Sequence, residues 1–274
     1  MSVISVMWIR DGVLVDRMHV NPVAFAVAYM AGSGTHCRRP GLLEDLINFG
    51  FEKSGISCAE KMHLYNLERD NLLSNVEQAV SLYNDLAAIA AEQCDYFEGA
   101  VELLRHLSEC GVKNYITSAV EQENLDKWSH SPQGAKIAPY LTEILGRRQN
   151  FIKGQDHFKY VSDRSDGTYY VADAVSEIAT GKKFSSQFNV RPIGFAHAIT
   201  RQRVGEAVDS VYAALRSVDL ASDLANALPA HLDKLQLPAG EEIARALTEA
   251  GAEFTVTDPQ LYTNLRAYFH DCLP

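Results

Sequence analysis

Val3-Ile4-Ser5-Val6-Met7-Trp8-Ile9 leads directly into Arg10-Asp11-Gly12, and this junction near the start of the chain decides the fold. An apolar run of this length is typical of a buried β-strand, and an Asp-Gly pair is typical of the turn that follows one. The junction therefore predicts a strand whose carboxyl end carries a loop with an acidic side chain.

Beyond residue 97, short apolar stretches alternate with helical patterns. The predicted strands are Val112–Ile116, Tyr169–Ala172, Pro192–Ala196 and Glu253–Val256. Such alternation is typical of a doubly wound, parallel α/β sheet. Ligands bind such sheets beyond the carboxyl ends of the strands. Asp11, Thr117 and Asp173 each follow a predicted strand, so we expect them at one edge of the sheet.

Residues 17–97 differ from this pattern, because apolar residues recur there at three- and four-residue spacing with almost no β-rich alternation. A block of about 80 residues is long enough for a small helical bundle. We therefore predict a helical domain at 17–97 and an α/β core formed by 1–16 plus 98–274. Within the core, helical patterns over Val204–Arg216 and Leu220–Leu235 predict a helical insertion at 201–239.

Composition narrows the class of protein. The chain has 274 residues and a formal net charge of −10, which argues against nucleic acid as a partner. No apolar run approaches the roughly 18 residues of a membrane helix, and no signal peptide is recognisable at the N-terminus. The five cysteines are widely spaced, without a Cys-x-x-Cys pair, and indicate reduced thiols. We therefore predict a cytoplasmic protein with no membrane partner.

The junction at Asp11 resembles the first motif of the haloacid dehalogenase (HAD) superfamily, Asp-x-Asp-Gly-[Thr/Val]-Leu-x-Asp, with Asp11, Gly12 and Asp16 in place. Three later segments resemble the other motifs in their family order: Tyr115-Ile116-Thr117-Ser118, residues 151–158 around Lys153, and Val171-Ala172-Asp173-Ala174-Val175-Ser176-Glu177. The resemblance implies a Rossmann-like core. It also implies an α-helical cap between the first and second motifs, where residues 17–97 lie.

The resemblance implies a role for each motif residue. Family members attack a phosphoryl group with the first aspartate of the first motif, and Ile9 stands at that position. Asp11 would be the catalytic acid and base. The implied phosphate-binding residues are Thr117, Ser118 and Lys153, and the implied Mg²⁺ ligands are Asp11, Asp173 and Glu177. The residues alone leave structural roles open, such as a turn for Asp11 and a helix N-cap for Asp173.

Ile9 leaves two functions open, because an isoleucine can neither attack phosphorus nor bind a metal. The first is a catalytically impaired relative, a pseudoenzyme that binds a phosphorylated small molecule, or a protein partner or second copy through 201–239. The alternative is an active Mg²⁺-dependent phosphohydrolase that uses Asp11 and a metal-bound water. Loss of one carboxylate would weaken any Mg²⁺ site.

Two further side chains bear on this choice. Alternation along the first strand predicts that Arg10 points away from the face shared by Ile9 and Asp11. The nine histidines show no metal-binding spacing and are interpreted as structural; among them, His197 follows the end of a predicted strand.

Overall fold

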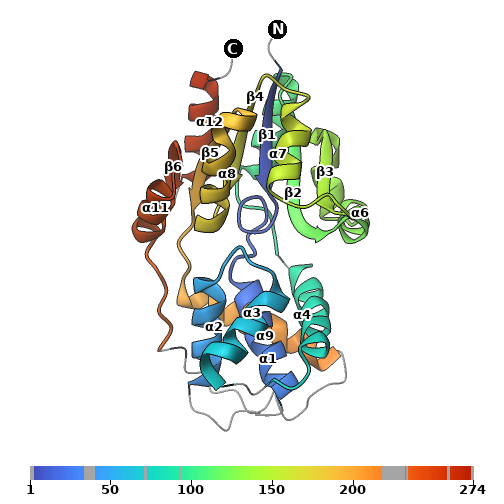
Figure 1. The fold of residues 1–274 in the computed structure, drawn as a ribbon, viewed down its shortest axis with the longest axis vertical. Helices are drawn as coiled ribbons and strands as arrows, with labels where there is room; N and C mark the ends of the chain where they lie inside the picture. The colour runs from blue at the N-terminus through green and yellow to red at the C-terminus, as the bar shows by residue number, and fades with distance from the viewer. Residues whose placement is uncertain are drawn as a thin grey trace. The chain divides into compact units, whose positions relative to one another are not determined.

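The computed structural model describes residues 3–33, 41–70, 73–92, 94–217, 232, 234–257 and 260–272. The chain divides into two units, each assembled from separate segments (Figure 1). Residues 1–16, 95–198 and 239–274 form an α/β unit, and residues 17–94 and 199–238 form a helical unit. The helix predicted at Leu220–Leu235 falls almost entirely outside the described residues.

The α/β unit contains a six-stranded parallel sheet in the order β3-β2-β1-β4-β5-β6. The strands are β1 (Ile4–Ile9), β2 (Lys113–Glu121), β3 (Glu143–Arg147), β4 (Gly167–Ala172), β5 (Val190–Ala196) and β6 (Phe254–Thr257). The chain runs outward from β1 to one edge and then outward from β4 to the other, which confirms the predicted doubly wound α/β fold.

Helices cover both faces of this sheet. They are α5 (Ala100–Glu109), α6 (Gln122–Ser129), α7 (Gln155–Ser162), α8 (Val175–Phe188), α11 (Gly240–Glu249) and α12 (Leu261–Cys272). The Trp8 ring meets Phe269 of α12, with centroids 6.0 Å apart, and the Tyr170 ring meets Phe158 of α7 at 5.0 Å. Tyr170 lies beside Met7 in the sheet, so its side chain points to the opposite face from Trp8. Thus α12 and α7 lie on opposite faces.

One buried polar residue joins three parts of this core. Asn114 of β2 is fully buried; its Oδ1 accepts from Trp8 Nε1 at 3.1 Å. Its Nδ2 donates to the carbonyls of Leu104 and Tyr140 at 3.2 and 3.1 Å. The side chain therefore hydrogen-bonds to three groups, two of them in fully buried contacts.

Replacing Asn114 with alanine is expected to lower the free energy of unfolding by about 2–4 kcal/mol, because it leaves the buried Trp8 indole N–H without its acceptor and removes two hydrogen bonds to backbone carbonyls. Urea unfolding followed by circular dichroism would measure the loss. Asn124→Ala, on the exposed face of α6, is the matched control and should change stability by less than about 0.5 kcal/mol. Equal effects in the two variants would contradict this account.

The helical unit is built around α1 (Val20–Ser33), in which ten of the 14 residues are buried. A helix that is apolar on all sides must be covered on all sides. Its neighbours are α2 (Leu42–Glu52), α4 (Val76–Ala91) and α9 (Arg201–Ser217). The helix α3 (Cys58–Tyr65) packs against α4 and continues into a π-helical turn, η1 (Asn66–Asp70).

The helix α9 lies in a different unit from the one the sequence predicts. Residues 201–239 were assigned to the α/β core, but this segment groups with residues 17–94. The reason is its apolar face: Val204, Val211 and Leu215 are fully buried in one core cluster with α1 and α4. The described part of this segment thus completes the core of the helical unit.

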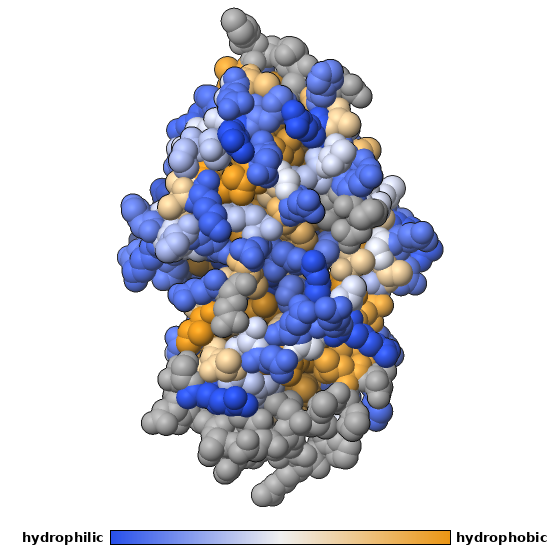
Figure 2. Space-filling view, turned by 180° about the vertical axis from the view of Figure 1, so that it is seen from behind, coloured by the Kyte–Doolittle hydropathy of each residue, from blue (hydrophilic) through white to orange (hydrophobic). Residues whose placement is uncertain are grey.

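Polar residues predominate on the face of the molecule drawn in Figure 2. Figure 2 shows that hydrophilic residues cover much of the coloured face, with hydrophobic residues in smaller patches between them. Across the described residues, no helix combines the length and apolar character needed to span a membrane.

Candidate functional site

The carboxyl ends of β1 and β4 lie side by side, and β2, which also pairs with β1, continues past them. Ile9 is level with Thr117 of β2, and Trp8 is level with Val171 of β4. Asp11 and Asp173 therefore follow neighbouring strands, as expected. Thr117 instead lies within β2, which continues to Glu121.

Ile9 ends β1 and belongs to the apolar core of the α/β unit. Its side chain is only 6% exposed and lies in the same cluster as Met7 and Val13. The position that the resemblance assigns to a nucleophile is thus occupied by buried hydrocarbon, which offers no lone pair to phosphorus or to a metal.

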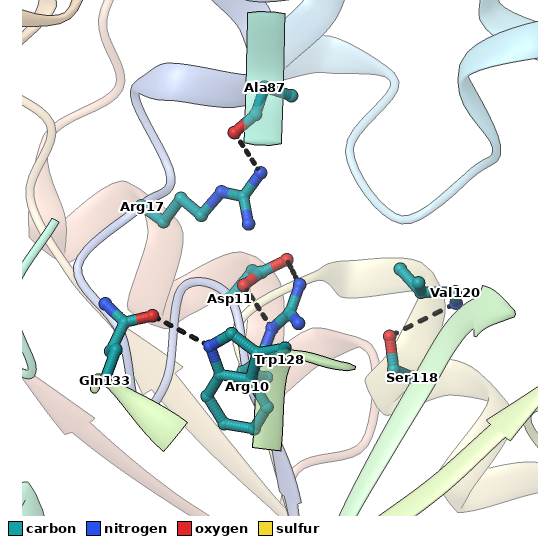
Figure 3. Close-up of polar contacts among 8 residues, drawn as sticks. All are labelled: Arg10, Asp11, Arg17, Ala87, Ser118, Val120, Trp128 and Gln133. Carbon is teal, nitrogen blue, oxygen red and sulfur yellow. Dashed lines mark hydrogen bonds and ion pairs between the residues drawn. The ribbon is translucent and has the colours of Figure 1, made fainter. Parts of the chain in front are cut away.

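Arg10 and Asp11 form a two-point ion pair (Figure 3). Arg10 Nε donates to Oδ1 of Asp11 at 2.8 Å and Nη2 donates to Oδ2 at 2.9 Å. The prediction that Arg10 points away from Asp11 is wrong, because β1 ends at Ile9 and strand alternation ends with it. The chain turns here, and the amides of Leu14 and Val15 both donate to the Arg10 carbonyl.

The other side of Arg10 is covered by an aromatic ring. Its guanidinium carbon lies 4.9 Å from the centroid of the Trp128 ring. Gln133 holds that ring by accepting from Trp128 Nε1 at 2.8 Å, and its backbone carbonyl accepts from the Tyr96 hydroxyl at 2.9 Å. None of these three residues was predicted to take part, because their positions in the sequence carry no motif.

The hydroxyl of Thr117 is turned into the protein. Thr117 is 1% exposed, and its Oγ1 lies 2.6 Å from Nδ1 of His157, which is also buried. Burial is the main cause that lowers the pKa of His157 to about 4, so the ring is neutral at physiological pH. The predicted phosphate-binding hydroxyl of Thr117 therefore has an internal partner.

Ser118 is the second predicted phosphate-binding hydroxyl. It is 9% exposed, and its Oγ accepts from the backbone N–H of Val120 at 3.2 Å (Figure 3). This bond orients the hydroxyl at the point where β2 passes the carboxyl end of β1.

Lys153 and Glu177 pair with each other. The Lys153 ammonium donates to one carboxylate oxygen of Glu177, and Tyr170 donates its hydroxyl to the other oxygen at 3.1 Å. The two side chains are 17% and 12% exposed. Both were predicted as site residues, for phosphate and metal respectively, and the structure brings them together as an ion pair.

Asp173 lies close to this pair. Burial raises its pKa to about 7, and the negative charges of Glu177 and, more weakly, Asp11 act in the same direction. Lys153 lowers the pKa but does not offset these effects. Asp173 therefore holds a proton over much of the range in which an ordinary aspartate is ionised.

These side chains do not fit a magnesium site. Proteins bind Mg²⁺ through carboxylates together with water, and those carboxylates must be ionised and available to the ion. Asp11 is held by Arg10 and Glu177 by Lys153, while Asp173 favours its protonated form. Among the residues that the structure describes, no group of three or more His, Cys, Asp or Glu side chains could hold a metal ion.

His197 takes part in packing within the α/β unit. It is 6% exposed, its Nε2 lies 3.7 Å from Oδ1 of Asp16, and its ring packs edge-on against Phe97 with centroids 4.7 Å apart. This arrangement links the loop after β1 to the end of β5.

Comparison with known proteins supports the fold. The chain matches no family model and no curated protein. Among solved structures it resembles a protein described as a predicted phosphatase from Clostridium acetobutylicum, at 15% identity, 99% coverage of this chain, 100% of that chain and a TM-score of 0.60.

Two other solved structures have a similar fold. A HAD family hydrolase from Deinococcus radiodurans R1, with bound phosphate and sodium, is 17% identical over 97% of this chain and 95% of that chain, with a TM-score of 0.56. A hydrolase from Pseudomonas syringae is 16% identical over 96% and 98%, with a TM-score of 0.57. Likeness at such low identity establishes architecture alone. This chain therefore has the fold of the HAD hydrolases.

Proposed function

We propose that this protein does not transfer phosphoryl groups and instead binds a phosphorylated small molecule at the carboxyl edge of its sheet. One observation supports the proposal: Ile9, at the position that the resemblance assigns to the nucleophile, is buried, and the next carboxylate, Asp11, is paired with Arg10. A covalent phospho-aspartate cannot form on isoleucine. Asp11 in its two-point pair is poorly placed to give up or take a proton.

The polar side chains at the carboxyl edge of the sheet support the binding of a phosphate. Arg10 and Lys153 bring N–H donors to it, each beside the carboxylate with which it pairs, and Ser118 brings an oriented hydroxyl. The structurally similar hydrolase from Deinococcus radiodurans R1 binds phosphate. We further propose that the helical unit is the cap domain that the resemblance implies.

Wild-type protein is expected to show no Mg²⁺-dependent hydrolysis of p-nitrophenyl phosphate above the rate without protein. Asp11→Ala should leave this background unchanged, since Asp11 does no chemistry. Turnover that needs Mg²⁺ and disappears in Asp11→Ala would establish the alternative, an active phosphohydrolase that uses Asp11 and a metal-bound water.

Phosphorylated ligands are expected to raise the melting temperature where their unphosphorylated parents do not. Inorganic phosphate and a panel of sugar phosphates, each with and without EDTA, are suitable probes for thermal shift. Ser118→Ala should weaken the binding about threefold to tenfold, corresponding to about one hydrogen bond. Ser186→Ala, which removes an exposed hydroxyl on α8, should leave it unchanged. A panel without any phosphate-specific shift would refute the binding proposal.

A protein partner or second copy contacted through 201–239 remains a separate prediction. The apolar face of α9 is used within the helical unit, so a contact through α9 would use its polar face, which includes Gln202, Glu206 and Arg216. Light scattering after gel filtration would measure the oligomeric state, and reversing the charge of Glu206 should change it if α9 forms the contact.

A further inference from the structure

We infer that Arg10 takes the place of a divalent cation at this site: its guanidinium neutralises Asp11 and keeps metal ions from it. The inference rests on the proposed function in placing ligand binding at the same edge of the sheet. It goes beyond that function by assigning the positive charge of the site to a side chain of this chain.

The geometry of the pair leaves a cation little access to Asp11. Both carboxylate oxygens accept a guanidinium N–H, at 2.8 and 2.9 Å, in the parallel arrangement that makes arginine–carboxylate pairs strong. A metal ion would have to replace these bonds and then lie beside a positive charge. The Arg10 side chain is only 8% exposed, so water screens this repulsion poorly.

Arg10 is also held from its other side. Trp128 packs against the guanidinium at 4.9 Å, and Gln133 fixes the indole through a 2.8 Å hydrogen bond. The Arg10 carbonyl accepts from the amides of Leu14 and Val15 at 3.0 and 2.8 Å, which fixes the backbone. An arginine whose backbone, stem and head group are all constrained loses little entropy by holding Asp11.

The Arg10–Asp11 pair determines what the Ile9→Asp substitution should do to metal binding. If the missing nucleophile were the only obstacle to metal binding, Ile9→Asp would restore it. If Arg10 excludes the cation, restoring the carboxylate is insufficient and Arg10 must also be removed.

Manganese binding, measured by electron paramagnetic resonance of free Mn²⁺, separates these possibilities without any assay of turnover. We expect no saturable binding in wild-type protein or in Ile9→Asp, and binding tighter by roughly tenfold or more in Ile9→Asp/Arg10→Ala. The matched control is Ile9→Asp/Arg147→Ala, which removes the solvent-exposed arginine paired with Glu121 and should behave like Ile9→Asp. Equal Mn²⁺ binding by Ile9→Asp and Ile9→Asp/Arg10→Ala would overturn the inference.

A carboxylate at buried position 9 can prevent folding, and Arg10→Met provides a second test. Methionine keeps an unbranched side chain and removes both guanidinium bonds from Asp11, so Mn²⁺ should bind measurably more tightly than to wild-type protein. Unchanged binding in Arg10→Met would contradict the inference. Tight Mn²⁺ binding by wild-type protein would refute it while leaving the proposed function standing, whereas Mg²⁺-dependent turnover by wild-type protein would refute that function.

Discussion

Lys153→Met is expected to lower the free energy of unfolding by about 3–5 kcal/mol, because it leaves the largely buried carboxylate of Glu177 without its cation. The remaining partner, the Tyr170 hydroxyl, contributes a hydrogen bond but no charge. Asp173 lies near enough for its own ionisation to oppose that of Glu177. Chemical denaturation at neutral pH would measure the loss.

Two further variants make this prediction specific. Lys153→Met/Glu177→Gln removes both charges and should recover most of the lost stability. Lys159→Met removes a lysine paired with Asp163 at 2.7 Å on the exposed face of α7, and should cost less than about 0.5 kcal/mol. A Lys153→Met variant as stable as Lys159→Met would contradict the prediction, because it would show that another group stabilises the charge of Glu177.

Asp173→Asn is expected to stabilise the protein above pH 7 by about 2–4 kcal/mol and to change little at pH 4. The folded-state pKa of about 7 lies above the 3.8 of an ordinary aspartate. Between these values the unfolded chain has released the proton that the folded chain retains, so each unit of rising pH favours unfolding by up to about 1.4 kcal/mol. This loss of folding stability is complete above the folded-state pKa. Asparagine has no proton to release in this range, so the variant does not lose stability in this way.

Unfolding measured from pH 4 to pH 8, in EDTA so that no metal contributes, would show this difference as a flatter profile for Asp173→Asn. The control is Asp126→Asn, an exposed carboxylate on α6, whose profile should follow that of wild-type protein. Parallel profiles for wild-type protein and Asp173→Asn would mean that Asp173 ionises normally in the folded state.

The central part of the fold could be predicted from the sequence because its strands are buried on both faces. The strands β1, β4 and β5 are mainly apolar and almost entirely buried, and the turn at Gly12 has a φ of 90°, which suits glycine. The edge strand β3 could not be predicted, since Glu-Ile-Leu-Gly-Arg is short and only partly buried. Its Gly146 is required because a Cβ there would lie 2.8 Å from the Cα of Gln122.

The sequence predicts where the residues of the candidate site lie, but it does not predict which side chains they contact. Strand ends fix where Asp11 and Asp173 lie, and this follows from local sequence. The contacts of Arg10 and Thr117 do not follow from local sequence. Their partners, Trp128 and His157, come from distant segments of the chain. The direction of Arg10 was predicted wrongly because strand alternation was extended one residue past the end of β1.

The helical unit is completed by α9, which follows the strands through β5 in the chain and yet packs against α1 and α4. During translation, α1 leaves the ribosome long before the segment that covers one of its apolar sides. Until residues 201–217 are synthesised, that side of the nascent helix has no native partner and is available to chaperones or to other unfinished chains. A stop codon between β5 and α9 would therefore yield an aggregation-prone product, although the truncated chain would still contain every segment from residue 17 to residue 94.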